Sequence, residues 1–152
     1  MVGLSYVNRI GTLNLISLID LPLKAYIPDD YVNDIDMRLS IYQKLTGLTT
    51  REQADDLSKE LLDRFGPLPV EVQNLVYVLV VKAIALKTGI DTIASNDGLV
   101  TIRLLPGLMI KRERLGPMYR YAPKIGISQL SINIKRLGKD WQKIFEELLN
   151  CL

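Results

Sequence analysis

Residues 50–89 read TREQADDLSKELLDRFGPLPVEVQNLVYVLVVKAIALKTG, and this stretch decides the class of fold. Its first half, about residues 50–65, is predicted to form one amphipathic helix, because apolar side chains recur every three or four positions. Gly66 and Pro67 end that helix. The second half, from Pro69 to Gly89, is apolar on most of its circumference, which is typical of a central, buried helix. The apolar stripe of the first helix consists of Ala54, Leu57, Leu61 and Phe65.

The region before this stretch predicts one more helix and a capping signal. Thr49 to Glu52 has the spacing of a capping box, in which the hydroxyl satisfies the amide three residues on and Glu52 reaches back. The upstream helix is expected over about residues 34–46, with Asn33 or Asp34 as its cap and Gly47 at its end. Its apolar stripe consists of Ile35, Leu39, Tyr42 and Leu45.

The chain after residue 89 reads as strands followed by a helix. Residues 90–94 and 99–104 flank Ser95-Asn96-Asp97-Gly98, and Asp-Gly between two β-rich runs is a strong hairpin signal. Alternation predicts a further strand over residues 130–134, whereas residues 106–126 show no clear period. A closing helix is expected over about residues 139–149, with one side formed by Trp141, Ile144, Phe145 and Leu148. The order predicts an α+β fold with three N-terminal helices, a small, mostly antiparallel sheet and a closing C-terminal helix.

The first residues of the chain suggest an extended arm. Residues 12–27 alternate loosely and contain Pro22, with Pro28 following, so they are interpreted as extended segments at the edge of a sheet. Residues 1–19 are interpreted as an N-terminal extended segment or linker, and residues 20–152 as the domain proper.

Composition removes several kinds of chemistry. The chain has 152 residues, 48% of them apolar, which is enough for a buried core. It has no histidine and a single cysteine, Cys151, so Ser-His and Cys-His pairs, imidazole or cysteine metal sites and an internal disulfide are not available. This cysteine usage favours a reducing compartment, and no apolar run is long enough for a membrane helix. We therefore expect a cytoplasmic protein with no membrane partner.

No catalytic or cofactor site is expected in this chain. Gly138-Lys139 is followed by Asp140 and has no glycine five residues upstream, so it does not form a phosphate-binding P-loop. The paired carboxylates at residues 29–30 and 34–36 are interpreted as turn and capping residues, because nothing places two carboxylates in a cleft with opposed environments. An enzymatic role is the least favoured of the functions considered.

The charge is unevenly distributed, and one helix carries a row of acidic residues. Residues 1–73 hold 7 basic and 11 acidic side chains, and residues 74–152 hold 12 basic and 6 acidic ones. At 100° per residue, four carboxylates fall opposite the apolar stripe of the helix at 50–65, and each neighbouring like-charged pair costs an isolated helix roughly 0.2–0.5 kcal/mol. This row is either an ordinary solvated face or a docking surface for arginines of another domain. It consists of Glu52, Asp56, Glu60 and Asp63.

Residues 103–124 form a basic segment with interleaved tyrosines. Basic side chains beside aromatic rings suit phosphate contact and base stacking, so the segment is a candidate for nucleic-acid binding. A solvated basic loop, or a docking face for an acidic partner, explains the same composition. The candidate contact residues are Arg112, Arg114, Tyr119 and Arg120.

A family resemblance covers about residues 20–90. Asp20-Leu21-Pro22, followed by residues 25–31 (AYIPDDY), resembles the opening of the C-terminal domain of bacterial transcription-repair coupling factors. The most specific match is residues 60–69 (ELLDRFGPLP), and residues 85–90 close the matching block. From residue 91 onward the order of elements is similar, but the residues are not diagnostic.

The resemblance implies a regulatory module of a larger, ATP-driven DNA translocase that acts on stalled RNA polymerase and recruits the excision-repair protein UvrA. In such proteins the motor domains lie upstream and bind ATP and magnesium, so residues 1–19 would lead from that motor region. The C-terminal domain packs against a UvrB-like N-terminal module of the same polypeptide, which hides the UvrA-binding surface. Carboxylates of the ELxDRFG stretch, here Glu60 and Asp63, take part in this contact. The resemblance thus implies a non-catalytic, autoinhibitory domain.

Overall fold

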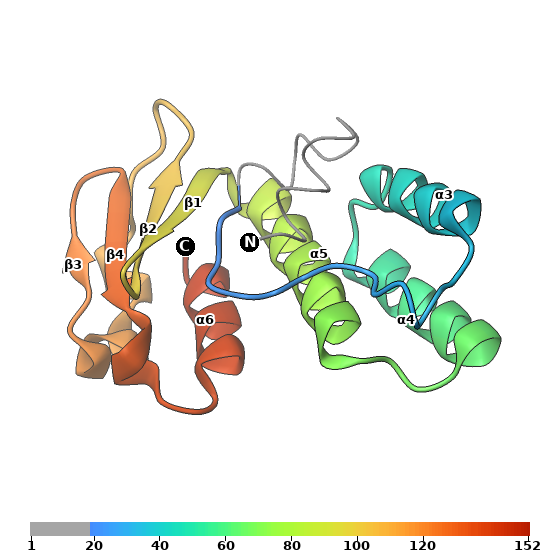
Figure 1. The fold of residues 1–152 in the computed structure, drawn as a ribbon. Coiled ribbons are helices and arrows are strands. Elements are labelled where there is room, and N and C mark those ends of the chain that lie inside the picture. The colour runs from blue at the N-terminus through green and yellow to red at the C-terminus, as the bar shows by residue number, and fades with distance from the viewer. Residues whose placement is uncertain (1–18) are drawn as a thin grey trace. The chain divides into compact units, whose positions relative to one another are not determined.

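The computed structural model describes residues 19–152, which fall into two compact units (Figure 1). The helical unit contains residues 23–83, and the sheet unit contains residues 19–22 and 84–152. The helix α5 (Val70–Thr88) begins in the first unit and ends in the second. Over the described part of the chain, no helix combines the length and the hydropathy needed to cross a membrane.

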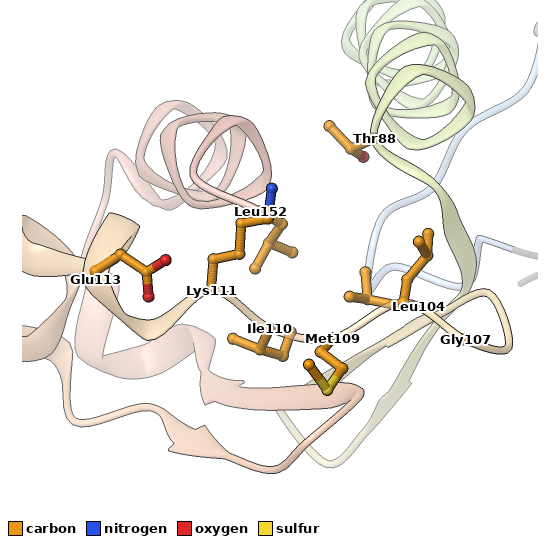
Figure 2. A pocket seen from close by; sticks show the side chains of 9 residues that line it. Thr88, Leu104, Gly107, Met109, Ile110, Lys111, Glu113 and Leu152 are labelled. Atoms are coloured by element: carbon orange, nitrogen blue, oxygen red, sulfur yellow. The ribbon is translucent and has the colours of Figure 1, made fainter.

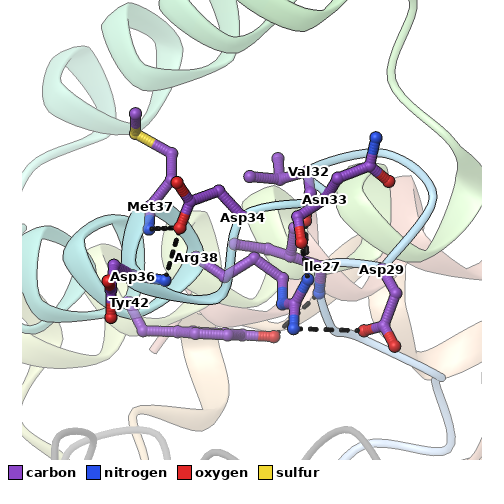
Figure 3. A network of polar contacts seen from close by, with 9 residues as sticks. All are labelled: Ile27, Asp29, Val32, Asn33, Asp34, Asp36, Met37, Arg38 and Tyr42. Atoms are coloured by element: carbon purple, nitrogen blue, oxygen red, sulfur yellow. Dashed lines mark hydrogen bonds and ion pairs between the residues drawn. The ribbon is translucent and has the colours of Figure 1, made fainter.

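The helical unit is built from α3 (Ile35–Thr46), α4 (Arg51–Phe65) and the first part of α5. Asp34 caps α3, because its Oδ1 accepts hydrogen bonds from the amides of Asp36 at 2.8 Å and Met37 at 3.3 Å (Figure 3). The three helices and their sequence bounds confirm the predicted pattern to within one or two residues.

The predicted apolar stripe of α3 is wrong at its first position. Ile35 is 55% exposed, and the buried residues of the helix are Ile41, Tyr42 and Leu45. In the first turn Arg38 occupies the inward position, where its side chain is 12% exposed and its Nη1 donates to the carbonyl of Val32 at 2.7 Å (Figure 3). The guanidinium donates a hydrogen bond to a loop carbonyl at this position, which an isoleucine side chain could not do.

The predicted capping box of α4 is shifted by one residue. Thr50 is the N-cap, and its hydroxyl accepts from the amide of Gln53, while Gln53 Oε1 accepts from the amide of Thr50 at 3.1 Å. The same Oε1 accepts from the Thr49 amide at 2.8 Å. Gln53 thus accepts the hydrogen bond from the capping residue's amide that was expected of Glu52. The Glu52 carboxylate therefore stays exposed on the first turn.

Helix α5 is the most buried helix, as its apolar composition predicts. One member of its buried surface is unexpected. The Lys82 side chain is 2% exposed, and its Nζ donates a long hydrogen bond of 3.4 Å to the carbonyl of Thr46 at the end of α3. Burial lowers the pKa of this ammonium group from its ordinary value of 10.5.

The sheet unit contains a four-stranded antiparallel sheet in the order β1-β2-β4-β3. Its strands are β1 (Ile90–Asn96), β2 (Leu99–Leu104), β3 (Lys124–Ile125) and β4 (Gln129–Asn133). The predicted hairpin is confirmed, with Asp97 at φ 52° and Gly98 at φ 84° in the turn. Ile19 forms a parallel bridge to Ile93 of the edge strand β1, so the expected edge position is confirmed at this residue, whereas residues 20–27 form no strand and residues 23–27 belong to the helical unit. The rest of that extended segment, residues 12–18, lies outside the described residues.

One face of this sheet is buried and the other is open. Val100, Ile102, Leu130 and Ile132 alternate along β2 and β4 and are at most 1% exposed. Helix α6 (Trp141–Asn150) lies beside the sheet (Figure 1), and its own buried residues are Phe145, Leu148 and Leu149. The predicted closing helix is therefore present, and Leu149 belongs to its buried side.

The segment without a readable period, residues 106–126, contains two 3₁₀ helices, η1 (Arg112–Arg114) and η2 (Gly116–Tyr121). Such helices have three residues per turn, so their apolar residues do not repeat with the 3.6 period of an α-helix. Ile110, Leu115 and Met118 are buried and hold the segment in place. Beyond β4, the predicted last strand residue Ile134 begins another such helix, η3 (Ile134–Leu137).

Candidate functional site

The outer face of α4 presents a line of three exposed carboxylates. Glu52, Asp56 and Asp63 are exposed, and none forms a hydrogen bond or an ion pair with another residue between 19 and 152. Their spacings of four and seven residues place them along one line of the helix. Three of the four carboxylates of the acidic stripe (Glu52, Asp56, Glu60 and Asp63) are therefore exposed to solvent.

Glu60 differs from the other three because it is engaged within the helical unit. Its Oε1 lies 2.6 Å from Lys44 Nζ at the end of α3, and its Oε2 lies 3.1 Å from Arg64 Nη1. The hydrogen bond from Lys44 is the main cause that lowers the pKa of Glu60, burial acts in the opposite direction, and Arg64 lowers it further. Of the four carboxylates interpreted as a solvated face or a docking surface, Glu60 therefore already has partners within the chain, because the approach of α3 supplies Lys44.

Arg64 links this ion pair to the end of α4. Its guanidinium lies 5.0 Å from the centre of the Phe65 ring, and its Nη2 lies 3.1 Å from Met37 Sδ. Arg64, the residue after Asp63, therefore contacts both α3 and Glu60. These contacts hold its guanidinium in a defined position.

Both ends of α4 are fixed, which makes the stripe a rigid element. The capping box at Thr50 and Gln53 defines the N-terminal end. At the other end, the Tyr31 hydroxyl lies within hydrogen-bonding distance of two carbonyls, those of Leu61 at 3.1 Å and Gly66 at 2.8 Å. The Tyr31 and Phe65 rings lie 5.8 Å apart at 58°. Tyr31 lies in the AYIPDDY stretch of the family resemblance, but no local pattern predicts its contacts, because its partners are backbone carbonyls more than 29 residues away.

The four basic-segment candidates divide into two groups. Arg112 donates to the carbonyl of Ile125 at 2.9 Å, and the Tyr119 hydroxyl donates to the carbonyl of Arg112 at 3.1 Å, so these two hold the segment together. Arg114 is exposed and makes no hydrogen bond or ion pair with the described residues. The Arg120 guanidinium lies 5.2 Å from the Tyr121 ring. The geometry leaves Arg114 and Arg120 available to a ligand.

A shallow cavity of about 390 Å³ in the sheet unit has an apolar wall (Figure 2). Leu104, Leu108, Met109 and Ile110 supply most of that wall, and Lys111 and Glu113 supply its charged side chains. Among the side chains of the lining there is one hydroxyl, that of Thr88, one carboxylate and one ammonium group. Among the residues described, no three Asp, Glu or Cys side chains gather as metal ligands would. The acidic stripe is therefore the stronger candidate for a functional surface.

Comparison with known proteins identifies one family over more than half of the chain. The family model for the TRCF domain matches residues 21–115. A transcription-repair-coupling factor of Staphylococcus epidermidis (strain ATCC 35984) is 31% identical over 141 residues, which cover 88% of this chain and 12% of that protein. The transcription-repair-coupling factor of Buchnera aphidicola subsp. Acyrthosiphon pisum is 35% identical over 117 residues, 77% of this chain and 14% of that protein.

A solved structure shares the fold. The crystal structure of the C-terminal domain of a transcription-repair coupling factor matches with a TM-score of 0.70 and 23% identity, covering 88% of this chain and 91% of that one. This chain spans about one eighth of the length of the curated relatives above. The chain belongs to the TRCF domain family, as the family model and its similarity to bacterial transcription-repair-coupling factors show.

Proposed function

We propose that this chain is a non-catalytic, autoinhibitory domain of an ATP-dependent DNA translocase that couples transcription to nucleotide excision repair in the bacterial cytoplasm. The acidic stripe on α4 docks on a UvrB-like module of the same polypeptide and masks the surface that UvrA binds. Engagement of RNA polymerase releases the contact. ATP and magnesium bind to upstream motor domains, and DNA contacts the full-length protein there.

The observation that carries the proposal is the exposed carboxylate of Asp63, which has no partner among residues 19–152, on a helix fixed at both ends. A carboxylate with this geometry can accept two parallel hydrogen bonds from one arginine. Because the helix is already ordered, binding costs little conformational entropy beyond that of the side chains. Asp56 lies two turns before Asp63 on the same line and extends the surface.

Glu60 has a different part in the proposed contact. Its two oxygens are held by Lys44 and Arg64, so an incoming guanidinium must either share Glu60 with them or displace Lys44. An exchange of one ion pair for another changes the free energy little. Exposed ion pairs contribute about 0–1 kcal/mol each, so a few of them form a contact that a second partner can release.

The experiment measures binding between this 152-residue chain and the separately produced UvrB-like module by isothermal titration calorimetry. The variant Asp56→Lys/Asp63→Lys should weaken binding at least tenfold, because it places two cations where the partner presents cations. The matched control is Glu147→Lys, which reverses one exposed charge on α6 in the sheet unit. Equal affinity of the double variant and the unmodified chain would refute the docking surface.

A second arm tests autoinhibition in the full-length protein. The same double variant should raise the basal ATPase rate and the binding of UvrA, since both are restrained in the docked state. A double variant that loses affinity for the UvrB-like module without raising either activity would show that α4 docks but does not inhibit.

A further inference from the structure

We propose that the open face of the sheet binds the sugar-phosphate backbone of a single-stranded nucleic acid. The open face is the side of the sheet opposite the buried one and lies in the sheet unit, so the inference does not depend on docking through α4. Its side chains are supplied by alternate residues of all four strands, namely Thr92, Ala94, Asn96, Leu99, Thr101, Arg103, Lys124, Gln129, Ser131 and Asn133.

The strand register places two cations on this face. Lys124 pairs with Ser131, which pairs with Thr101, so these three form one row across the sheet. Arg103 pairs with Gln129 in the neighbouring row. With strands about 4.8 Å apart and two residues spanning about 6.8 Å, the Cα atoms of Arg103 and Lys124 lie roughly 12 Å apart. One strand of nucleic acid can contact both.

The face is exposed, and its two cations have no partner in the described part of the chain. Arg103, Lys124 and Gln129 are exposed, whereas their neighbours in sequence Ile102 and Leu130 are fully buried on the other side. Within residues 19–152, neither Arg103 nor Lys124 forms an ion pair or a hydrogen bond through its side chain. Exposed Arg and Lys side chains that have no carboxylate partner can neutralise the phosphates of a nucleic-acid backbone.

No carboxylate occupies this face among the strand residues that form it. The acidic residues of β1 and its turn, Asp91 and Asp97, lie at the bulge and in the turn, outside the paired rows. A third cation lies near the turn, because a Cβ on Gly98 would be 3.6 Å from Lys135 Cε. The described sheet unit holds eleven Lys and Arg against seven Asp and Glu, a net charge of +4.

The middle of the face favours a nucleic acid over an acidic protein. Thr101 and Ser131 form a hydroxyl pair 2.9 Å apart, and Gln129 and Asn133 add amide groups. Hydroxyl and amide groups donate to phosphate, sugar and exposed base edges. The core of a protein interface is instead apolar and aromatic, and Leu99, at 38% exposure, is the one large apolar side chain of this face. A single strand is favoured because its base edges are open to the amides.

The test uses this chain and a fluorescein-labelled 20-nucleotide oligo-dT in fluorescence anisotropy titrations. If Arg103, Lys124 and Lys135 each neutralise one phosphate, the logarithmic salt slope is about −2, and affinity falls roughly 20-fold from 50 to 200 mM salt. Arg103→Ala/Lys124→Ala should reduce the magnitude of the slope by about 1.4. The matched control, Lys139→Ala/Lys143→Ala, removes the same charge outside the open face and should keep the slope.

Several results would overturn the proposal. The first is the absence of oligo-dT binding at 20 mM salt. The second is that Arg103→Ala/Lys124→Ala binds oligo-dT as tightly as the unmodified chain. The third is that Arg114→Ala/Arg120→Ala loses binding while Arg103→Ala/Lys124→Ala keeps it. Equal affinity for a 20-base-pair duplex would indicate a general electrostatic field instead of a single-strand site. Tighter binding of a glutamate-rich peptide than of oligo-dT would assign the face to an acidic protein. Circular dichroism of each variant checks that the exposed substitutions leave the fold intact.

Discussion

The Nζ of Lys44 lies 2.6 Å from the Oε1 of Glu60, and this contact joins the last turn of α3 to the middle of α4. Arg64 contacts the other oxygen of Glu60 from one turn further along α4. Both cations are partly exposed, so their contribution to stability is small, but they give Glu60 a fixed orientation. Asp63, without such a partner among the described residues, remains open to a contact from outside.

Glu60→Gln should lower the free energy of unfolding at pH 7 by about 0.2–1 kcal/mol, the range for exposed ion pairs. The pKa of Glu60 in the folded chain is below its ordinary value of 4.5, so its contribution is complete above 4.5 and is lost as pH falls through the folded-state pKa. Urea unfolding at several pH values should show the difference between the two proteins shrinking toward acid pH. Asp63→Asn is the control and should change stability little at pH 7.

Tyr42→Phe should destabilise the helical unit by about 1–3 kcal/mol. The Tyr42 side chain is 1% exposed, and its hydroxyl oxygen accepts a hydrogen bond of 2.8 Å from the amide of Ile27 (Figure 3). Removing the oxygen leaves a buried amide without that acceptor. Chemical denaturation measures the loss, and Tyr26→Phe, whose hydroxyl bonds to none of the described residues, serves as the comparison. Equal stability of the two variants would contradict the assignment.

Lys82→Met should raise the free energy of unfolding at pH 7 by about 1 kcal/mol, because it removes a buried charge whose one hydrogen bond to the described residues is 3.4 Å long. The pKa of Lys82 is lowered in the folded chain, so the destabilisation caused by its charge is complete below that folded-state pKa. It is relieved as pH rises toward the ordinary value of 10.5. The advantage of the variant should therefore be smaller at pH 10 than at pH 7. A variant less stable than the unmodified chain at pH 7 would show that the hydrogen bond to Thr46 outweighs desolvation.

Gly89→Ala should destabilise the sheet unit more than Gly107→Ala. Both glycines have positive φ, 80° and 89°, so each substitution costs roughly 1–2 kcal/mol in backbone strain. At Gly89 the added Cβ would also lie 2.4 Å from Leu108 Cδ1, whereas nothing lies within 4 Å at Gly107. Thermal unfolding of the two variants isolates the steric part. Adding Leu108→Ala to Gly89→Ala should recover part of the loss, and a purely additive double variant would argue against the clash.

Local patterns in the sequence predicted most elements of the fold. The 3.6 period placed α4 and α5, and Gly66 and Gly89, both at positive φ, end these helices where expected. The Asp97-Gly98 signal predicted the hairpin, because its turn requires positive φ at both positions. The 3₁₀ segment at residues 112–121 could not be predicted in this way, since its two short helices offer only one apolar spacing, from Leu115 to Met118, which is too short to define a period.

Less of the candidate site than of the fold could be predicted from the sequence. Helical geometry placed Glu52, Asp56 and Asp63 on one exposed line, because that line follows from spacing alone. Spacing could not show that Lys44 would reach Glu60, since the two residues are 16 positions apart and belong to different helices. Nor could it show that Arg112 would donate to the carbonyl of Ile125 and leave Arg114 free of that role.

By itself, then, the sequence determined the α-helices, the β1–β2 hairpin and β4, and approximately where each of them begins and ends. These properties depend on backbone geometry and on neighbours within a few residues. Only the tertiary structure decided which charges have partners, that Lys82 is buried, and that the sheet has an open face with Arg103 and Lys124 on it. Those properties depend on how separate elements approach one another, and a hydrogen bond or ion pair is made or lost over about 1 Å of that approach.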